Sequence, residues 1–302
     1  MTIEEVIATV PDWAGQDVGV EPIEGGLTNQ NYRLTVAGTR YCVRIPGAGS
    51  SLLAIDRQIE YHNTLAAAES GVGAKVVYAV GELPVMVLEW IDGVVQTDEQ
   101  LRECPGSMRK LAESTRQLHA GPAFQRHFDM FAIQEGYLRI CRERGFAIPE
   151  TYDEYEPLVR RIEEAVAVQG HELLPCNNDL LAANFIDEGD RFRIIDYEYS
   201  GMNDPCFELG NAAAESKLAD DQLNELISLY FGRPLRNRVA RAHLWALMAN
   251  YGWTLWACIQ RAVSDIDFDF WAWGVDDKYA RAIEAFEGPN FGAWLEDVKR
   301  AD

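Results

Sequence analysis

Residues 176–186 read CNNDLLAANFI, and residues 191–201 read RFRIIDYEYSG. Asp179 and Asn184 lie five positions apart in the first segment, and Asp196 follows an apolar, strand-like run in the second. Carboxylate and amide oxygens are the hard ligands that Mg²⁺ prefers, and a further carboxylate can orient an attacking hydroxyl. Phosphoryl transfer requires such a set, because it depends on positioning and charge neutralisation. Asp and Asn are also common turn residues, so the rest of the chain must support this interpretation.

The residues that precede this stretch alternate in the manner of β-strands. Tyr32, Leu34 and Val36 alternate with polar residues, AGTR forms a turn, and residues 41–45 alternate again, which predicts a β-hairpin. A helix is predicted from about residue 52 to 70, where two glycines end it. The runs KVVYAV and VMVLEW around GELP predict a second hairpin. We therefore expect strands with one inserted helix over the first ninety residues.

The pattern changes after Ile91, Asp92 and Gly93. Long helical patterns dominate from about residue 97, broken once by a strand-like segment at 192–195, and no internal repeat is present. The chain is therefore predicted to be an α+β protein with two lobes. Residues 1–92 would form a small β-rich N-lobe with one helix, and residues 93–302 a larger, mainly helical C-lobe.

The predicted N-lobe contains residue types that suit a bound phosphate. Residues 24–32 read EGGLTNQNY and place two glycines and small polar residues at a strand–turn–strand, where backbone N–H groups can approach phosphates. Arg44 interrupts the apolar alternation of the next strand, and Glu60 lies on the following helix, within reach of it. A cation held by a helix carboxylate is the way kinase-type lobes present charge to nucleotide phosphates.

Six segments in this order resemble the choline/ethanolamine kinase family, including its bacterial LicA-type branch, within the aminoglycoside phosphotransferase-like kinase fold. They read GGLTNQNY, YCVRIPG, IDRQIEYHNTL, VMVLEWIDG, CNNDLLAANF and IIDYEYSGMNDPCFELGN. The resemblance covers roughly residues 20–280, and its last segment is the most specific. It implies a protein-kinase-like fold and an enzyme that uses ATP and Mg²⁺ to phosphorylate an alcohol. By this resemblance the β-sheet of the N-lobe, residues 1–92, would bind the nucleotide. The C-lobe, residues 93–302, would hold the catalytic loop, the metal site and the substrate pocket.

The resemblance also implies roles for individual residues. Asp179 would be the catalytic base or hydroxyl-orienting residue, while Asn184 and Asp196 would complete the catalytic set by holding Mg²⁺. Arg44, held in place by Glu60, would contact the ATP phosphates. The Gly25–Asn31 loop would cover those phosphates through Gly26, Thr28, Asn29 and Asn31. The backbone around Glu89 to Ile91 would bind the adenine edge.

Two positions depart from the family pattern. The catalytic loop of the family opens with His two residues before the catalytic Asp, whereas this chain has Asn177. Because that His mainly braces the loop, we expect Asn177 to replace it as a hydrogen-bond donor. Glu208 stands where the family usually has Asp in the segment after the metal-binding aspartate.

The C-terminal third is rich in aromatic residues. Trp253 and Trp256 lie three positions apart in NYGWTLWACIQ, so both project from one face of the predicted helix. A quaternary ammonium is bound best by aromatic faces, because its methyl groups donate no hydrogen bonds. This segment resembles the choline-binding helix of the family, and Trp273 falls where the family has a third aromatic residue. By the same resemblance Tyr199 and Glu215 would be on the substrate side, with Glu215 offsetting the cationic headgroup.

Composition narrows the range of partners. The 302 residues include 27 Lys and Arg against 48 Asp and Glu, which gives a formal net charge of −21. A surface with this much negative charge repels nucleic acid and anionic membranes. We therefore expect neither as a partner. The longest apolar helix candidate, residues 244–259, is interrupted by Asn250, and no transmembrane segment is expected. Six scattered cysteines without a CxxC pair, and no recognisable signal peptide, favour a cytoplasmic protein with reduced thiols.

We therefore expect a kinase that phosphorylates the hydroxyl of choline, a small-molecule substrate, to phosphocholine. Ethanolamine remains an open alternative, as does the oligomeric state. Another small-molecule kinase of the same fold, acting on an aminoglycoside, homoserine or a methylthio-sugar, is the second hypothesis. A non-catalytic pseudokinase is suggested only by Asn177. It is disfavoured because a binding module has no need of Asp179, Asn184 and Asp196 together.

Overall fold

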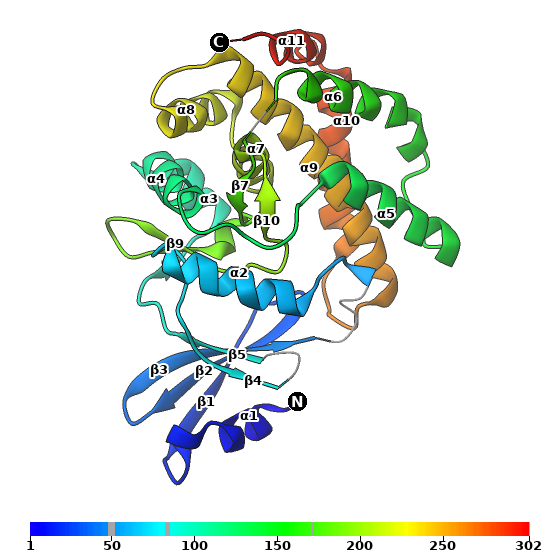
Figure 1. Cartoon of the computed structure of the whole chain (residues 1–302). Helices are drawn as coiled ribbons and strands as arrows, with labels where there is room; N and C mark the ends of the chain where they lie inside the picture. Colours follow the sequence, from blue (N-terminus) through cyan, green and yellow to red (C-terminus); the bar gives the residue numbers. More distant parts are fainter. Residues whose placement is uncertain (48–51, 82–84, 171, 302) are drawn as a thin grey trace.

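The computed structural model describes residues 1–47, 52–81, 85–170 and 172–301 (Figure 1). Following the predicted boundary, we call residues 1–92 the N-lobe and the remainder the C-lobe. The N-lobe is built on a five-stranded antiparallel sheet in the order β1-β2-β3-β5-β4. Its strands are β1 (Val18–Ile23), β2 (Asn29–Val36), β3 (Thr39–Pro46), β4 (Val76–Val80) and β5 (Val85–Glu89). Both predicted hairpins are confirmed, although residues 82–84 of the second turn lie outside the described residues.

The alternating residues of the first hairpin form a small core of their own. Leu34 and Val43 are fully buried in it, because alternate side chains of a strand face the same side. This core also takes Val6 from α1 (Ile3–Thr9) and Trp13 from the short 3-10 helix η1 (Pro11–Trp13). The prediction of one helix in the N-lobe was therefore wrong. A capping box at Thr2 starts α1, but seven residues are too few to show a clear helical period.

The second N-lobe helix, α2 (Arg57–Glu69), lies between the sheet and the C-lobe (Figure 1). It begins at Asp56, whose carboxylate accepts hydrogen bonds from the backbone of Gln58 and Ile59. The helix is therefore about five residues shorter at its start than predicted. Its inner face carries the charged side chains of Arg57 and Glu60, both buried. A buried charge requires partners, and these lie in the site described below.

The C-lobe is a helical assembly around α9. Its helices are α3 (Asp98–Glu103), α4 (Ser107–His119), α5 (Met130–Arg144), α6 (Glu156–Val168), α7 (Pro205–Glu215), α8 (Asp220–Phe231), α9 (Arg236–Val263), α10 (Ala280–Glu287) and α11 (Phe291–Asp297). Between α9 and α10 the chain forms a π-helix, η5 (Ala272–Tyr279). Residues 240–260 of α9 are buried with the exception of Ala246, because neighbouring helices cover α9 on several sides (Figure 1). No helix among the described residues combines the length and apolarity needed to cross a bilayer.

Short strands carry the segments that were quoted first. They are β6 (Val94–Val95), β7 (Leu174–Cys176), β8 (Phe185–Asp187), β9 (Phe192–Ile194) and β10 (Gly201–Asn203), with the 3-10 helix η4 (Ala182–Asn184) before β8. They pair as β6-β8-β9 and as β10-β7. The expectation of a single strand-like break was wrong, because strands of two or three residues are too short to show a period of two. Residues 177–181 and 195–200 are loops held between these elements.

A buried ionic group anchors the start of α7. Asp204 caps the helix by accepting a hydrogen bond from Cys206 N, and its other oxygen accepts from Arg241 and from Trp245 Nε1. Asp204 is fully buried and Arg241 is almost so. Removing one member of such a group leaves the other in a low-dielectric interior without its counter-charge.

We therefore expect Asp204→Ala to lower the free energy of unfolding by about 3 kcal/mol or more. The measurement is urea denaturation followed by circular dichroism, with the exposed Asp190→Ala as control. An Asp204→Ala midpoint equal to that of the control would show that this group does not anchor the helix.

Candidate active site

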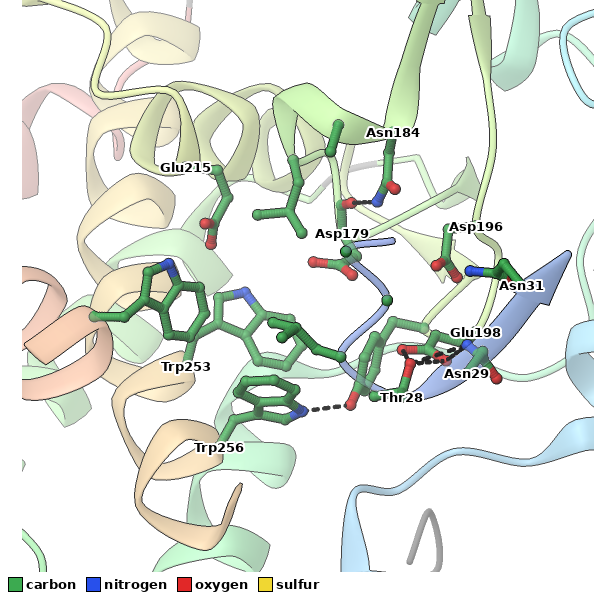
Figure 2. Close-up of a pocket in the computed structure, with 17 residues that line it drawn as sticks. Thr28, Asn29, Asn31, Asp179, Asn184, Asp196, Glu198, Glu215, Trp253 and Trp256 are labelled. Carbon is green, nitrogen blue, oxygen red and sulfur yellow. Dashed lines mark hydrogen bonds between the residues drawn. The ribbon is translucent and has the colours of Figure 1, made fainter. Parts of the chain in front are cut away.

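One pocket lies between the loop that joins β1 to β2 and the C-lobe (Figure 2). It brings together residues that are more than two hundred positions apart in the sequence. Of the predicted site residues, those that line it are Gly26, Thr28, Asn29, Asn31, Asp179, Asn184, Asp196, Tyr199, Glu215, Trp253, Trp256 and Trp273. Asp179 lies between the polar end, with Asn184 and Asp196, and the aromatic end (Figure 2).

The β1–β2 loop has a backbone that only glycine permits. Gly25 has φ of 99°, a backbone conformation that residues with a Cβ rarely adopt. A Cβ on Gly26 would lie 2.5 Å from the carbonyl oxygen of Asn29, so the chain could not turn back as tightly. These two glycines bring the backbone of the loop over the pocket, as the sequence pattern predicted.

This N-lobe loop is also tied to the C-lobe. Thr28 Oγ1 donates to the Glu198 carboxylate at 2.9 Å, and Asn29 Nδ2 donates to it at 3.0 Å. On the other side of the loop, Gln260 Nε2 of α9 donates to the carbonyl oxygen of Leu27 at 3.2 Å. The loop therefore spans from the polar end of the pocket to the helix that bears its tryptophans.

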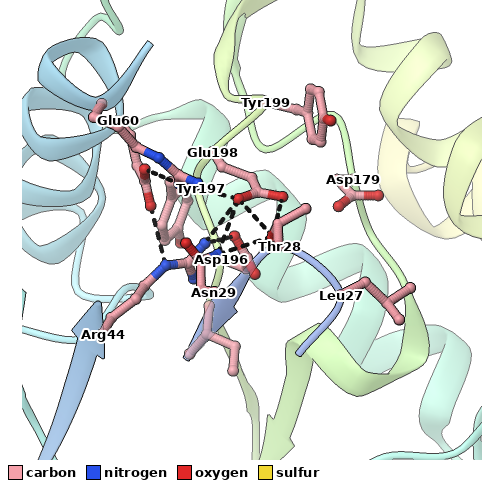
Figure 3. Close-up of polar contacts among 12 residues, drawn as sticks. Leu27, Thr28, Asn29, Arg44, Glu60, Asp179, Asp196, Tyr197, Glu198 and Tyr199 are labelled. Carbon is pink, nitrogen blue, oxygen red and sulfur yellow. Dashed lines mark hydrogen bonds and ion pairs between the residues drawn. The ribbon is translucent and has the colours of Figure 1, made fainter. Parts of the chain in front are cut away.

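A group of three carboxylates and two guanidinium groups lies at the polar end, and all of its members except Asp196 are buried (Figure 3). Arg44 Nε is 3.1 Å from Glu60 Oε1, as predicted, and the same guanidinium pairs with Asp196 and Glu198. Arg57 Nη1 pairs with Glu60 at 2.7 Å and with Glu198 at 3.2 Å. Burial and the Asp196 carboxylate raise the pKa of Glu198 to about 7, although Arg44 opposes the rise. The group joins β3 and α2 of the N-lobe to the loop after β9.

Arg57 and Glu198 belong to this group but are not among the site residues predicted from the sequence. A local signal existed for Arg57, which lies three positions before Glu60 and so shares its helix face. For Glu198 no local signal existed, because its partners Thr28, Asn29, Arg44 and Arg57 are at least 141 positions away.

The loop that carries Asp179 is braced by hydrogen bonds on both sides. Asn177 Nδ2 donates to the carbonyl oxygens of Ile195 and Asp196, and its Oδ1 accepts from Asp179 N at 3.0 Å. The Glu208 carboxylate accepts from the backbone N–H groups of Asn177 and Asn178. Both departures from the family pattern therefore serve the conformation of this loop, and neither side chain lines the pocket.

Asp179 is surrounded by other carboxylates. Burial raises the pKa of the Asp179 carboxyl well above its ordinary value, and the charges of Glu215 and Asp196 add to the rise, whereas Lys278 opposes it. A cation bound in the pocket would favour the ionised form of Asp179. The electrostatics of the pocket therefore suit a positively charged ligand.

The polar end fits a magnesium ion by the chemistry of its donors. Asn184 Nδ2 donates to the Asp179 carbonyl oxygen at 2.7 Å, which leaves its Oδ1 as an acceptor at the pocket wall. Asp196 lines the same wall, and oxygens of Glu60, Asp196 and Glu198 all lie within 4.8 Å of one another. Amide and carboxylate oxygens are the ligands that Mg²⁺ takes in proteins.

The aromatic end is formed by side chains whose orientations are fixed. Trp253 Nε1 donates to Asn211 Oδ1 at 2.9 Å. Trp256 Nε1 donates to the Tyr199 hydroxyl at 2.8 Å (Figure 2). Trp256 and Trp273 pack edge to face with centroids 5.6 Å apart. Because the indole N–H groups are already bonded to protein, the wall can offer aromatic surface to a ligand.

Two of the predicted site residues form ion pairs that the sequence did not indicate. Glu215, predicted to offset a cationic headgroup, is paired with the buried ammonium of Lys278. Glu89, predicted to lie at the adenine edge, pairs with Arg193 at 2.8 Å, which helps to lower the pKa of its carboxyl despite partial burial. Neither Glu89 nor the buried Ile91 lines the pocket. Both lie where β5 ends and the chain passes into the C-lobe.

Comparison with known proteins also indicates a phosphotransferase. A family model for phosphotransferase enzymes, APH, matches residues 19–244. The crystal structure of a choline/ethanolamine kinase family protein from Mesorhizobium loti has 33% sequence identity, covers 99% of each chain and superposes with a TM-score of 0.86.

Two curated relatives are more distant in sequence. Ethanolamine kinase 2 from Mus musculus is 25% identical over 297 residues, which is 88% of this chain and 76% of that protein. Protein LicA from Haemophilus influenzae is 26% identical over 214 residues, which is 68% of this chain but only 61% of LicA. Together with the family model and the full-length structural match, these similarities show that the chain belongs to the phosphotransferase enzyme family. Within that family it is a small-molecule kinase of the choline/ethanolamine kinase group.

Proposed function

We propose that this kinase transfers the γ-phosphoryl group of ATP to the hydroxyl of choline, with Mg²⁺, to give phosphocholine and ADP. The observation that carries the proposal is the arrangement of one pocket. Hard oxygen donors and the glycine loop lie at one end, three tryptophans lie at the other, and Asp179 is between them (Figure 2). A small molecule with a cationic headgroup and a hydroxyl fits this order of chemistries.

Asp179 is the residue placed to act on the hydroxyl. Its carboxylate accepts the hydroxyl proton as the substrate oxygen forms a bond to the γ-phosphorus, and the bond from that phosphorus to the oxygen bridging to the β-phosphate breaks. The braces from Asn177 and Asn184 hold the backbone of Asp179 and so define where its carboxylate points. Accurate placement of reacting groups supplies much of the acceleration in this class of reaction.

The N-lobe provides the nucleotide contacts. The loop of Gly26 to Asn31 covers the phosphates with backbone N–H groups, and Arg44 supplies positive charge beside them. Backbone groups between Glu89 and Ile91 receive the adenine edge. Mg²⁺, when bound through Asn184 and Asp196, neutralises charge on the phosphates. These are the roles that the resemblance implied. The loop, Asn184 and Asp196 line one pocket, which supports their roles, and Arg44 is paired with Asp196 at its polar end. Glu89 and Ile91 do not line the pocket, so their role rests on the resemblance alone.

The aromatic end favours a quaternary ammonium. Trp253, Trp256 and Trp273 present ring surface, and such faces attract a cation whose charge is spread over methyl groups. An aminoglycoside, by contrast, carries several primary amines and hydroxyls that require many polar partners. The family relationship and the three tryptophans together support choline over that alternative.

An assay of ADP release tests the proposed function. The purified chain is supplied with ATP, Mg²⁺ and one of choline, ethanolamine, homoserine or kanamycin. We expect the highest kcat/KM with choline. Turnover with kanamycin or homoserine, and none with choline or ethanolamine, would contradict the substrate assignment.

The tryptophan wall is tested by Trp256→Ala. A desolvated cation–π contact contributes about 2 kcal/mol, so its loss should raise the KM for choline about 30-fold and leave the KM for ATP nearly unchanged. Both constants are measured together with the melting temperature, because truncating a buried tryptophan also costs stability. Trp294→Ala is the matched control, since Trp294 packs on His243 outside the pocket. A parallel loss of affinity for ATP and choline would mean that Trp256 serves only the core.

A further inference from the structure

Glu215 shares its carboxylate with a resident ammonium group. Lys278 Nζ donates to Glu215 Oε2, and the same nitrogen lies 4.3 Å from the ring centroid of Trp273. The side chain of Lys278 is 1% exposed and that of Glu215 is 3% exposed. Glu215 and Trp273 line the pocket, whereas Lys278 does not and therefore lies behind them. The aromatic end thus already contains a paired cation when no ligand is bound.

The π-helix η5 is what brings Lys278 to this place. Lys278 follows Trp273 by five positions, and residues five apart lie about 140° away from each other around an α-helix. The wider turn of a π-helix, with its hydrogen bonds from residue i to i+5, brings such residues close to one face. η5 also packs closely on α9, because a Cβ on Gly274 would lie 2.1 Å from the Cβ of Ala257. Lys278 therefore shares the face that Trp273 turns toward the pocket.

The ion pair between Glu215 and Lys278 changes the charge that surrounds a bound substrate headgroup. Burial lowers the pKa of Lys278, but the Glu215 carboxylate opposes that change. Among the other charged groups near Lys278, Arg281 adds to the lowering of its pKa, and Asp179 opposes it. Arg281 is itself engaged by Asp277 at 3.1 Å and by the carbonyl oxygen of Ala214. Glu215 and Lys278 form a pair without net charge at the headgroup end.

We propose that Lys278 determines the acceptor preference of this kinase, by cancelling the charge of Glu215 so that the pocket selects a quaternary ammonium over a primary one. This inference rests on the proposed function and makes its substrate class narrower. A primary ammonium has three strongly hydrated N–H donors and must exchange water for a charged acceptor. Lys278 already occupies that acceptor. A trimethylammonium donates no hydrogen bonds, so it gives up none on leaving water and gains contact with the aromatic faces.

The first test removes the resident ammonium. In Lys278→Met the Glu215 carboxylate becomes available to a substrate N–H group. We expect the ratio of kcat/KM for choline to that for ethanolamine to fall about tenfold or more, mainly through a lower KM for ethanolamine. Lys217→Met is the control, because it removes an exposed lysine that pairs with Asp277 on the same side of the lobe. An unchanged ratio in folded Lys278→Met would overturn the proposal.

A second test applies if Lys278→Met fails to fold because Glu215 is left buried without its counter-charge. Glu215→Gln leaves Lys278 without its counter-charge and should raise the KM for choline about tenfold. The double variant Glu215→Gln with Lys278→Met removes both charges, so we expect its KM for choline to return to within about threefold of the original. A double variant that binds choline as weakly as Glu215→Gln alone would show that Glu215 itself holds the headgroup, and the proposal would then be wrong.

These outcomes are separable from a failure of the proposed function. If the unaltered protein releases no ADP with either choline or ethanolamine, the substrate class is wrong and the variants need not be compared. If it turns over both acceptors but prefers ethanolamine, the kinase function stands and the role of Lys278 is refuted.

Discussion

Asp179→Asn should reduce kcat about 10³-fold while leaving the KM values for ATP and choline within a few-fold of their original values. The amide has the shape of the carboxylate but cannot accept the hydroxyl proton. Its backbone contacts with Asn177 and Asn184 are unaffected, so the loop should keep its conformation. The measurement is steady-state kinetics at saturating ATP and Mg²⁺, with thermal melting to confirm the fold.

Asp187→Asn is the matched control for this variant. Asp187 follows the same loop and pairs with Lys110 at 2.8 Å, but it does not line the pocket. We expect its kcat to stay within a few-fold of the original. A full kcat for Asp179→Asn would remove Asp179 from the reaction, whatever its position between the two ends of the pocket.

Asp196→Asn should lower kcat/KM about 10³-fold, and its activity should require a higher Mg²⁺ concentration. Asp196 has φ of 64°, a left-handed conformation that asparagine adopts readily, so the exchange removes negative charge without straining the backbone. It also takes from Arg44 one of its three carboxylate partners. Titrating activity against Mg²⁺ separates a lost metal ligand from a disturbed loop. The same half-maximal Mg²⁺ concentration before and after the exchange would show that Asp196 is not a metal ligand.

Segments with a clear period were predictable from the sequence. The alternation around Leu34 and Val43 identified β2 and β3, because one face of that sheet is buried. Segments too short to show a period were not predictable. These include α1 and the strands of the C-lobe other than β9, which matches the strand-like segment predicted at 192–195. Their conformation is set by distant contacts, such as the pairing of β6 with β8 across more than ninety residues.

The same limit applies to the candidate site. Arg44 was recognisable because it interrupts an apolar strand, and its partner Glu60 lies on the next helix. Trp253 and Trp256 were recognisable because their spacing places them on one helix face, whereas Trp273 was indicated only by the family resemblance. Lys278 was not, since a spacing of five residues signals nothing unless the helix is of the π type. The pairing of Glu215 therefore emerged only from the structure.

The most direct test of the central claim is to identify the phosphorylated product itself. ³¹P nuclear magnetic resonance is recorded on the purified chain with ATP, Mg²⁺ and choline, and on a matched reaction without choline. We predict one phosphocholine for every ADP formed, and almost no inorganic phosphate in either reaction. ADP accompanied only by inorganic phosphate, or formed equally without choline, would contradict transfer of the phosphoryl group to the choline hydroxyl.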